Sequence, residues 1–236
     1  MTEFSASSRL LVMALILLAL AGCASTEAAK SNGDPYENVN RKVYSFNDKL
    51  DKNFFEPVAK KYAQYTPSPV RSGITNFFDN TGYLNTIAND LLQGKISQTA
   101  HDSGRFLVNS TIGIGGLFDP ATSMGLKQNS EDLGQTFGKW GMPTGPYLVI
   151  PFIGVSNLRD GIGNAIYSSL DPVWASHVPT RNVAFSLRMV SRRAGSLDAS
   201  AAIDDAALDK YQFVRDAYLQ RRRSMVDDDL NRAGRK

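Results

Sequence analysis

Apolar residues recur at helical spacing along most of this 236-residue chain. One stripe runs from Val39 to Phe54 at intervals of three and four residues, and a second begins at Ser68-Pro69 and ends before Gly94. Such intervals place apolar side chains on one face of an α-helix. Further helices are expected at about residues 96–111, 133–137, 158–170, 180–194 and 206–223. No segment alternates as a confident strand, so the chain is predicted to be all-α.

Prolines mark where these helices should begin or end. Asp34 followed by Pro35 is a helix-start signal, and Pro57 should break the first helix. Three prolines interrupt residues 141–154, where Tyr147 to Ile150 form either a buried strand or an ordered apolar loop. The longest apolar run after the N-terminus, Tyr147 to Val155, is far shorter than the roughly 20 residues that span a bilayer. No transmembrane helix is therefore expected in the mature chain.

The N-terminal segment predicts export and lipidation. Arg9 precedes the apolar run Leu10–Leu20, which has the length of a signal-peptide core. The run ends in Leu20-Ala21-Gly22-Cys23, which resembles the bacterial lipobox. Ala24 follows the cysteine, where the sorting rule of that motif would need Asp to retain a lipoprotein at the inner membrane. We expect residues 1–22 to be a signal peptide, 23–33 an acylated tether, 34–223 a helical domain and 224–236 a charged tail.

Composition excludes several classes of function. The chain has a single Cys and two His residues, which argues against a disulfide framework and against Cys- or His-based zinc sites. The net charge of +3 is too small to indicate a nucleic-acid binder. No metal or other cofactor is predicted, apart from the lipid attached to Cys23.

Catalytic motifs are incomplete. Gly113, Gly115 and Gly116 follow a helical segment and lack the spacing of a dinucleotide-binding loop. Ser156 lacks the second glycine of a nucleophile elbow, and either it or Asn157 is a better helix cap. His101 and Asp102 are neighbours on a helix, where side chains point about 100° apart, so they are not expected to form a dyad. The chain is predicted not to be an enzyme.

Many short motifs, in one order, resemble those of the MlaA/VacJ lipoproteins over residues 33–223. They include Gly33-Asp34-Pro35-Tyr36-Glu37, Asn40-Arg41, Tyr44, Phe46-Asn47, Asn76-Phe77-Phe78, Leu92-Gln93-Gly94, Asn109-Ser110-Thr111-Ile112-Gly113, Phe118-Asp119, Glu131-Asp132, Gly145-Pro146-Tyr147, Arg159-Asp160 and Val214-Arg215-Asp216-Ala217-Tyr218.

The resemblance implies a fold and a function. It implies a ring-like bundle of amphipathic helices in the inner leaflet of the outer membrane, associated with trimeric outer-membrane porins and facing the periplasm. Phospholipid mislocalised to the outer leaflet would pass through an amphipathic channel to a soluble periplasmic carrier of the MlaC type, which would maintain lipid asymmetry. A non-transporting lipoprotein that braces porins or the envelope remains the alternative. A lipid hydrolase that uses His101 or Ser156 is a third reading.

Individual site residues are expected on that basis. Candidates for the lipid path are Gly113, Gly115, Gly116 and Phe118, although turn geometry alone would also require the glycines. Candidates for membrane or porin contact are Asn76, Phe77, Phe78, Tyr147, Leu148, Ile150 and Phe152, although core packing explains the phenylalanines equally well. Arg159 either meets a lipid phosphate or is a solvated surface residue. The apolar stripes themselves either lie in a membrane interface or pack into an ordinary helical core.

Overall fold

The computed structural model describes residues 34–170 and 176–233. The predicted signal peptide, Cys23 and the tether lie outside the described residues. The helices are α3 (Glu37–Leu50), α4 (Glu56–Tyr65), α5 (Ser68–Leu92), α6 (Ile96–Thr111), α7 (Pro120–Ser123), α8 (Leu133–Lys139), α9 (Leu158–Leu170), α11 (Val178–Gly195), α12 (Leu197–Ala206) and α13 (Lys210–Ala233). The strands are β1 (Tyr147–Ile150) and β2 (Gly154–Asn157). The fold is mostly helical, as predicted.

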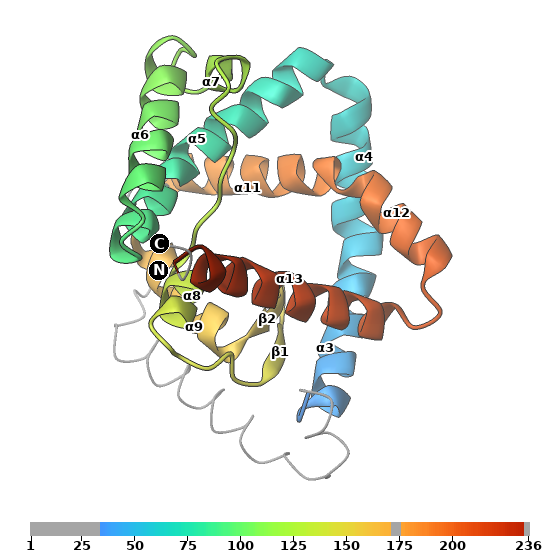
Figure 1. Ribbon diagram of the computed structural model, residues 1–236. Coiled ribbons are helices and arrows are strands. Elements are labelled where there is room, and N and C mark those ends of the chain that lie inside the picture. The colour runs from blue at the N-terminus through green and yellow to red at the C-terminus, as the bar shows by residue number, and fades with distance from the viewer. Residues whose placement is uncertain (1–33, 171–175, 234–236) are drawn as a thin grey trace.

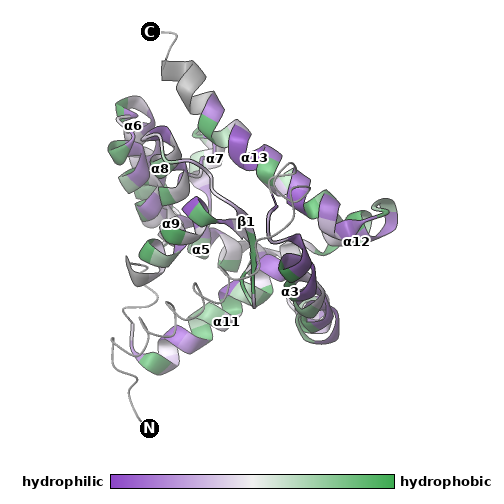
Figure 2. Cartoon of the chain, turned by 90° about the horizontal axis from the view of Figure 1, so that it is seen from below, coloured by the Kyte–Doolittle hydropathy of each residue, from purple (hydrophilic) through white to green (hydrophobic). Residues whose placement is uncertain are grey.

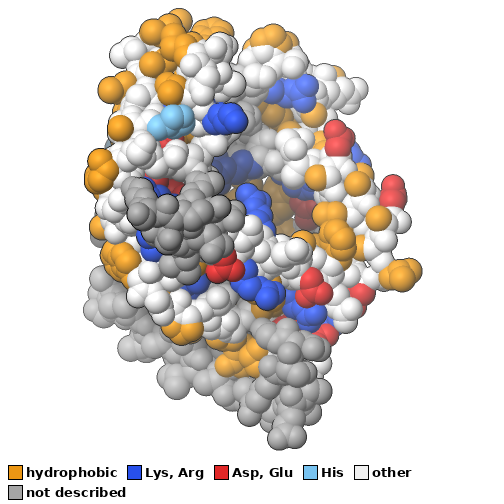
Figure 3. Space-filling model, in the orientation of Figure 1, with side chains coloured by type: hydrophobic (Ala, Val, Ile, Leu, Met, Phe, Trp, Pro, Cys, Tyr) orange, Lys and Arg blue, Asp and Glu red, His pale blue; other side chains and the backbone are white. Residues whose placement is uncertain are grey.

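The helices are arranged around a central opening rather than around one filled core. Figure 1 shows α4, α11 and α13 bordering this opening, and Figure 3 shows that the molecular surface is hollowed there, with Lys and Arg side chains around the hollow. Helix α11 packs against α4 and α5, while α13 packs against α8 and β2. Within the described residues, no helix is both long enough and apolar enough to cross a bilayer.

Pro57 was expected to break the first helix, but the helix continues past it. A π-helical turn, η1 (Asp51–Phe55), joins α3 to α4 without a gap. In this turn the Glu56 amide donates to the Asp51 carbonyl, five residues back. Pro57 then stands in the first turn of α4, where its missing N–H costs little. The wider turn therefore accommodates the proline, and α3, η1 and α4 form one continuous side of the ring.

A small antiparallel hairpin supplies the only strands in the described parts of the chain. Leu148 pairs with Ser156 and Ile150 with Gly154, so the buried-strand reading of residues 147–150 is correct. Side chains of α3 form hydrogen bonds with the backbone at the edge of β1 that does not pair with β2. Asn40 donates to the Tyr147 carbonyl at 3.0 Å and accepts from the Val149 amide at 2.9 Å. Asn47 donates to the Ile150 carbonyl and accepts from the Phe152 amide, each at 3.0 Å. The edge that would otherwise be open is thereby closed.

Both ends of the predicted helical domain differ from the structure. Helix α3 begins at Glu37, because the buried Asp34 carboxylate accepts hydrogen bonds from Asn40 and Tyr211 instead of capping the helix. The last helix does not end at Arg223 but continues to Ala233, into the segment expected to be a tail. Figure 2 shows α13 as mostly hydrophilic with interspersed hydrophobic residues, a pattern that hides helical periodicity.

Candidate functional site

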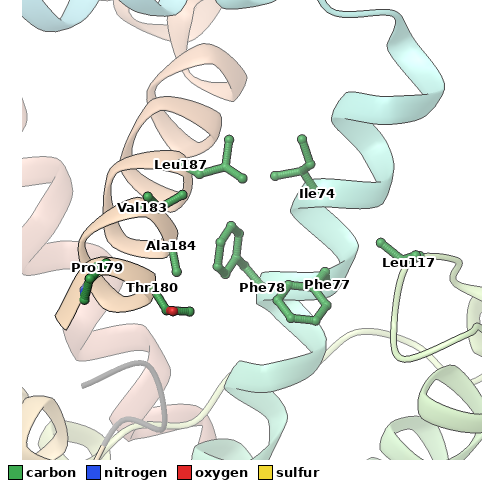
Figure 4. A pocket seen from close by; sticks show the side chains of 9 residues that line it. All are labelled: Ile74, Phe77, Phe78, Leu117, Pro179, Thr180, Val183, Ala184 and Leu187. Atoms are coloured by element: carbon green, nitrogen blue, oxygen red, sulfur yellow. The ribbon is translucent and has the colours of Figure 1, made fainter. Parts of the chain in front are cut away.

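An apolar pocket of about 540 Å³ opens between α5 and α11. Ile74, Phe77 and Phe78 of α5 face Val183 and Leu187 of α11 across it (Figure 4). The remaining lining residues are Leu117, Pro179, Thr180 and Ala184. The volume lies within the roughly 300–1,000 Å³ of ligand pockets. Only Thr180 among these side chains carries a polar atom, so the pocket suits a hydrocarbon chain.

A second, polar pocket of about 200 Å³ meets the first at Phe78, which lines both. Its walls include Asp79, Asn85, Gln128 and Arg192. An apolar pocket and a polar pocket that share one wall form an amphipathic surface. Such a surface can bind a molecule that has a hydrocarbon end and a polar end.

The glycine-rich turn after α6 lies beside the apolar pocket but contributes only Leu117 to its lining. A Cβ on Gly113 would lie 2.4 Å from the carbonyl oxygens of Asn109 and Phe118, and one on Gly116 would lie 2.6 Å from the Asn80 Cβ. Close packing therefore requires both glycines, Gly113 within the turn and Gly116 against α5. Gly115 has a φ of +68° but open space around it, and the Phe118 side chain is exposed.

The predicted contact residues divide into exposed and buried sets. Phe77 and Phe152 expose large parts of their rings, and Phe152 makes an edge contact with Phe46 at a centroid distance of 5.4 Å. Tyr147 is fully buried and Phe78 is 6% exposed, so neither is positioned for an external contact. Asn76, Leu148 and Ile150 are half-buried. Tyr147 lies in the core cluster with Val149 and Tyr211.

One end of the molecule exposes a group of apolar side chains, of which sequence reasoning singled out only Phe118. The group, here called the apolar tip, lies at the C-terminal end of α6, in the glycine-rich turn and after α7. It comprises Leu107, Ile112, Ile114, Phe118 and Met124. Figure 3 shows hydrophobic side chains gathered at this end of the molecule. Exposed apolar residues that cluster in this way mark a surface for contact with a membrane or a protein.

His101 and Asp102 do contact each other, contrary to expectation, through the Nδ1 and Oδ1 atoms at 2.9 Å. Gln98 and Asn129 also donate to the buried Asp102 carboxylate, at 3.1 and 2.9 Å. The buried Asp90 carboxyl lies next to Asp102, and neither of its oxygens has another hydrogen-bond partner among the described residues. This cluster is an interior polar network that ties α5 to α6.

The Asp90 carboxyl makes stability depend on pH. Burial, together with the neighbouring Asp102 carboxylate, raises its pKa to about 8. Because this value exceeds the unfolded pKa of about 3.9, the folded state holds an extra proton between about pH 4 and pH 8. The stabilising contribution of this group is complete below pH 4 and is lost as the pH rises through 8.

Replacing Asp90 with asparagine should therefore stabilise the protein increasingly as the pH rises from about 4 to 8, because the amide stays neutral and can still donate to Asp102. The melting temperature of Asp90→Asn should exceed that of the wild type by at least about 2–4 °C at the upper end of this range. Asp205→Asn, an exposed change on α12, should shift the melting temperature by the same amount at every pH in this range. If the difference in melting temperature between Asp90→Asn and the wild type does not change with pH, the assignment is wrong.

Ser156 and Arg159 are also held inside the protein. Ser156 is 2% exposed, and its hydroxyl donates to the Asn157 carbonyl. Asn157 caps α9 by accepting from the Asp160 amide at 2.8 Å. Arg159 is 4% exposed and lies 3.3 Å from Asp160, so it is not a solvated surface residue. With so little exposure, it is not positioned to meet a lipid phosphate either. A Cβ on Gly138 would lie 2.7 Å from the Arg159 guanidinium, which shows how tightly Arg159 packs.

Sequence reasoning missed a buried ion network that joins α8, α9 and α13. Arg222 donates to both oxygens of Asp132, at 2.6 and 2.8 Å, and to Asp160 at 2.9 Å. Tyr218 donates to Asp160 at 2.7 Å. The spacing of Tyr218 and Arg222, four residues apart on one helix face, was the available signal.

No group of acidic, His or Cys side chains in the described ranges is arranged to hold a metal ion.

Known proteins share both the sequence and the fold. The MlaA lipoprotein family profile matches residues 32–225. The Shigella flexneri intermembrane phospholipid transport system lipoprotein MlaA is 36% identical over 90% of this chain and 86% of its own length. Its Escherichia coli K12 counterpart is 35% identical over the same shares. A solved chain from a study of how bacterial outer-membrane lipid asymmetry is maintained superposes with a TM-score of 0.72 and 29% identity, covering 82% of this chain and 98% of that one. This chain belongs to the MlaA lipoprotein family.

Proposed function

We propose that this chain is the outer-membrane lipoprotein of an intermembrane phospholipid transport system. It removes mislocalised phospholipid from the outer leaflet through an amphipathic channel and passes it to a periplasmic carrier of the MlaC type. The observation that carries the proposal is the amphipathic surface where the apolar and polar pockets meet at Phe78. The relatives named as phospholipid transport lipoproteins give this surface its ligand class.

The predicted anchor and the exposed apolar surface support the proposed location. Acylation at Cys23 would hold the chain at the periplasmic face of the outer membrane, since several acyl chains make an effectively permanent anchor. The apolar tip would enter the inner leaflet, because burying its five exposed side chains removes apolar area from water. The central hollow between α4, α11 and α13 would then connect the membrane with the periplasm.

Trimeric outer-membrane porins are the proposed neighbours in the membrane. Phe77 and Phe152 are the exposed aromatic members of the predicted contact set, and they lie on different elements. Aromatic side chains are enriched in protein interfaces because they bury large areas. Association with a porin would place the hollow beside a protein wall rather than in continuous lipid.

Purified full-length protein should carry bound phospholipid. The acylated chain would be extracted from membranes in mild detergent and exchanged into fresh detergent, and its lipid would be measured by mass spectrometry. We expect intact phospholipid in the wild type and less in Leu187→Trp, where the larger side chain fills the apolar pocket. Ala201→Ser, an exposed change on α12, serves as the control.

Two results would contradict this proposal. Protein that carries no phospholipid, while remaining folded and porin-associated, would favour the bracing lipoprotein. Release of fatty acid or lysophospholipid during incubation would favour a hydrolase.

A further inference from the structure

The polar pocket next to the apolar pocket contains one cation and one carboxylate that do not pair with each other. Arg192 of α11 and Asp79 of α5 both line it. No carboxylate among the described residues lies within salt-bridge distance of Arg192, whose side chain is exposed. From the described residues, Asp79 accepts only one long hydrogen bond, 3.5 Å, from Gln128. Opposite charges therefore face one small space and remain available to a ligand.

The other charged residues of this pocket are already neutralised. Glu131 accepts from Lys95 at 2.7 Å, and Asp132 forms a two-bond ion pair with Arg222. The ligand would meet one positive and one negative group. At about 200 Å³ the space is below the roughly 300–1,000 Å³ of whole-ligand pockets, so it suits a polar group of a few atoms.

Phe78 is a lining residue of both pockets, so the two spaces are neighbours. The guanidinium carbon of Arg188 lies 5.1 Å from the centroid of the Phe78 ring. A molecule that occupied both spaces would pass a hydrocarbon chain along Phe77, Phe78 and Leu187, and its polar end would stop between Asp79 and Arg192.

We propose that the two pockets together hold one phospholipid with an amine-bearing, zwitterionic headgroup. An acyl chain lies between α5 and α11, the phosphate meets Arg192, and the ammonium group meets Asp79. This inference rests on the proposed function and adds a headgroup preference to it. Guanidinium groups match phosphate oxygens in geometry and charge, and a carboxylate accepts hydrogen bonds from an ammonium group.

The immediate surroundings of Asp79 support this arrangement. Burial raises the pKa of the Asp79 carboxyl, whereas the charge of Arg192 lowers it. A bound ammonium group would stabilise the ionised carboxylate, because an opposite charge at close range favours the charged form. A headgroup without an amine would leave Asp79 unpaired near the lipid phosphate. Phosphatidylethanolamine should therefore bind more tightly than phosphatidylglycerol.

Competitive photolabelling of the purified, acylated full-length protein tests this inference. The probe is phosphatidylethanolamine with a photoreactive group at the end of one acyl chain, and the competitors are unlabelled phosphatidylethanolamine and phosphatidylglycerol in matched detergent micelles. In the wild type, labelled peptides should come from α5 and α11, and phosphatidylethanolamine should compete better. Exposed charges elsewhere give the controls Asp205→Asn and Lys61→Gln, which should behave as wild type.

Two charge variants separate the roles of the two groups. Asp79→Asn should weaken competition by phosphatidylethanolamine by roughly three- to tenfold and leave phosphatidylglycerol unchanged. Arg192→Gln should weaken both competitors, because both carry a phosphate. A melting curve for each variant would establish that it is folded, and Ala184→Leu, a smaller change in the apolar pocket than Leu187→Trp, should also reduce labelling.

The inference fails if folded Asp79→Asn keeps the wild-type preference, or if the labelled peptides lie outside α5 and α11. Either result can coexist with normal removal of outer-leaflet phospholipid, which would leave the proposed function intact. Absence of labelling by any phospholipid, together with normal folding, would instead contradict both proposals.

Discussion

Replacing Arg222 with methionine is expected to lower the free energy of unfolding by about 3–5 kcal/mol. Arg222 is 9% exposed and bonds to the carboxylates of Asp132 and Asp160. Methionine keeps much of the side-chain volume but removes the positive charge. The half-buried Asp132 would then lose its counterion, and the buried Asp160 would keep only Arg159, at 3.3 Å, which is the costly way to break a buried ion pair. The junction of α8, α9 and α13 should loosen first.

Arg221→Met is the matched control for this prediction, because Arg221 is the preceding residue on α13 and is exposed. Its stability should stay within about 0.5 kcal/mol of the wild type. Both variants would be measured by denaturant unfolding of the detergent-solubilised protein. Equal unfolding midpoints for Arg222→Met and Arg221→Met would show that the network contributes little.

Gly116→Ala should destabilise the protein by about 3 kcal/mol, the second large effect. Gly116 has a φ of +90°, which side chains rarely adopt, and its new Cβ would lie 2.6 Å from the Asn80 Cβ. That atom is fixed to the α5 backbone, so the turn itself would have to shift. Asn80 also donates to the Ser110 hydroxyl at 2.9 Å, a contact between α5 and α6 that the shift would strain.

Gly115→Ala distinguishes steric packing from backbone strain alone. Gly115 also has a positive φ, +68°, but nothing lies within 4 Å of its new Cβ. It should lose only about 1 kcal/mol. Thermal melts of the two variants would measure the difference. If Gly116→Ala is as stable as Gly115→Ala, the turn is adaptable, and its glycines become better candidates for a moving part of the lipid path.

The local elements of this fold were predictable because their signals are local. Helix α5 begins at Ser68 next to Pro69 and ends before Gly94, which has the positive φ of a helix-terminating glycine. Asp132 caps α8 by accepting from the Gln135 amide, as its position before an apolar helix indicates. Each of these features depends on residues only a few positions apart.

Long-range polar contacts were not predictable from one sequence. Asp34 looked like a helix cap, yet it bonds with Tyr211 near the other end of the chain. Arg159 looked like a surface cation, yet it packs beside Asp160 and Gly138. Nothing in the spacing of these residues indicates their partners, because the ring closes only when distant helices meet.

The site was predictable in part. Phe77 and Phe78 were selected as membrane or porin contacts, and they line the apolar pocket, but α11, which forms the opposite wall, was not selected for any role. The glycine-rich turn was selected as a candidate for the lipid path, whereas Gly113 and Gly116 are packed tightly. A sequence pattern identifies which residues are unusual, and only the packing tells which of them border a space.

Outer-leaflet phospholipid in living cells tests the central claim most directly. A strain that lacks this chain would be labelled with a membrane-impermeant amine reagent, and modified phosphatidylethanolamine would be quantified with and without plasmid copies of the wild type and Leu187→Trp. Lipid transport predicts a rise in labelled lipid on deletion, full reversal by the wild type and incomplete reversal by an equally abundant Leu187→Trp. Outer-leaflet phospholipid that does not change on deletion would contradict the account.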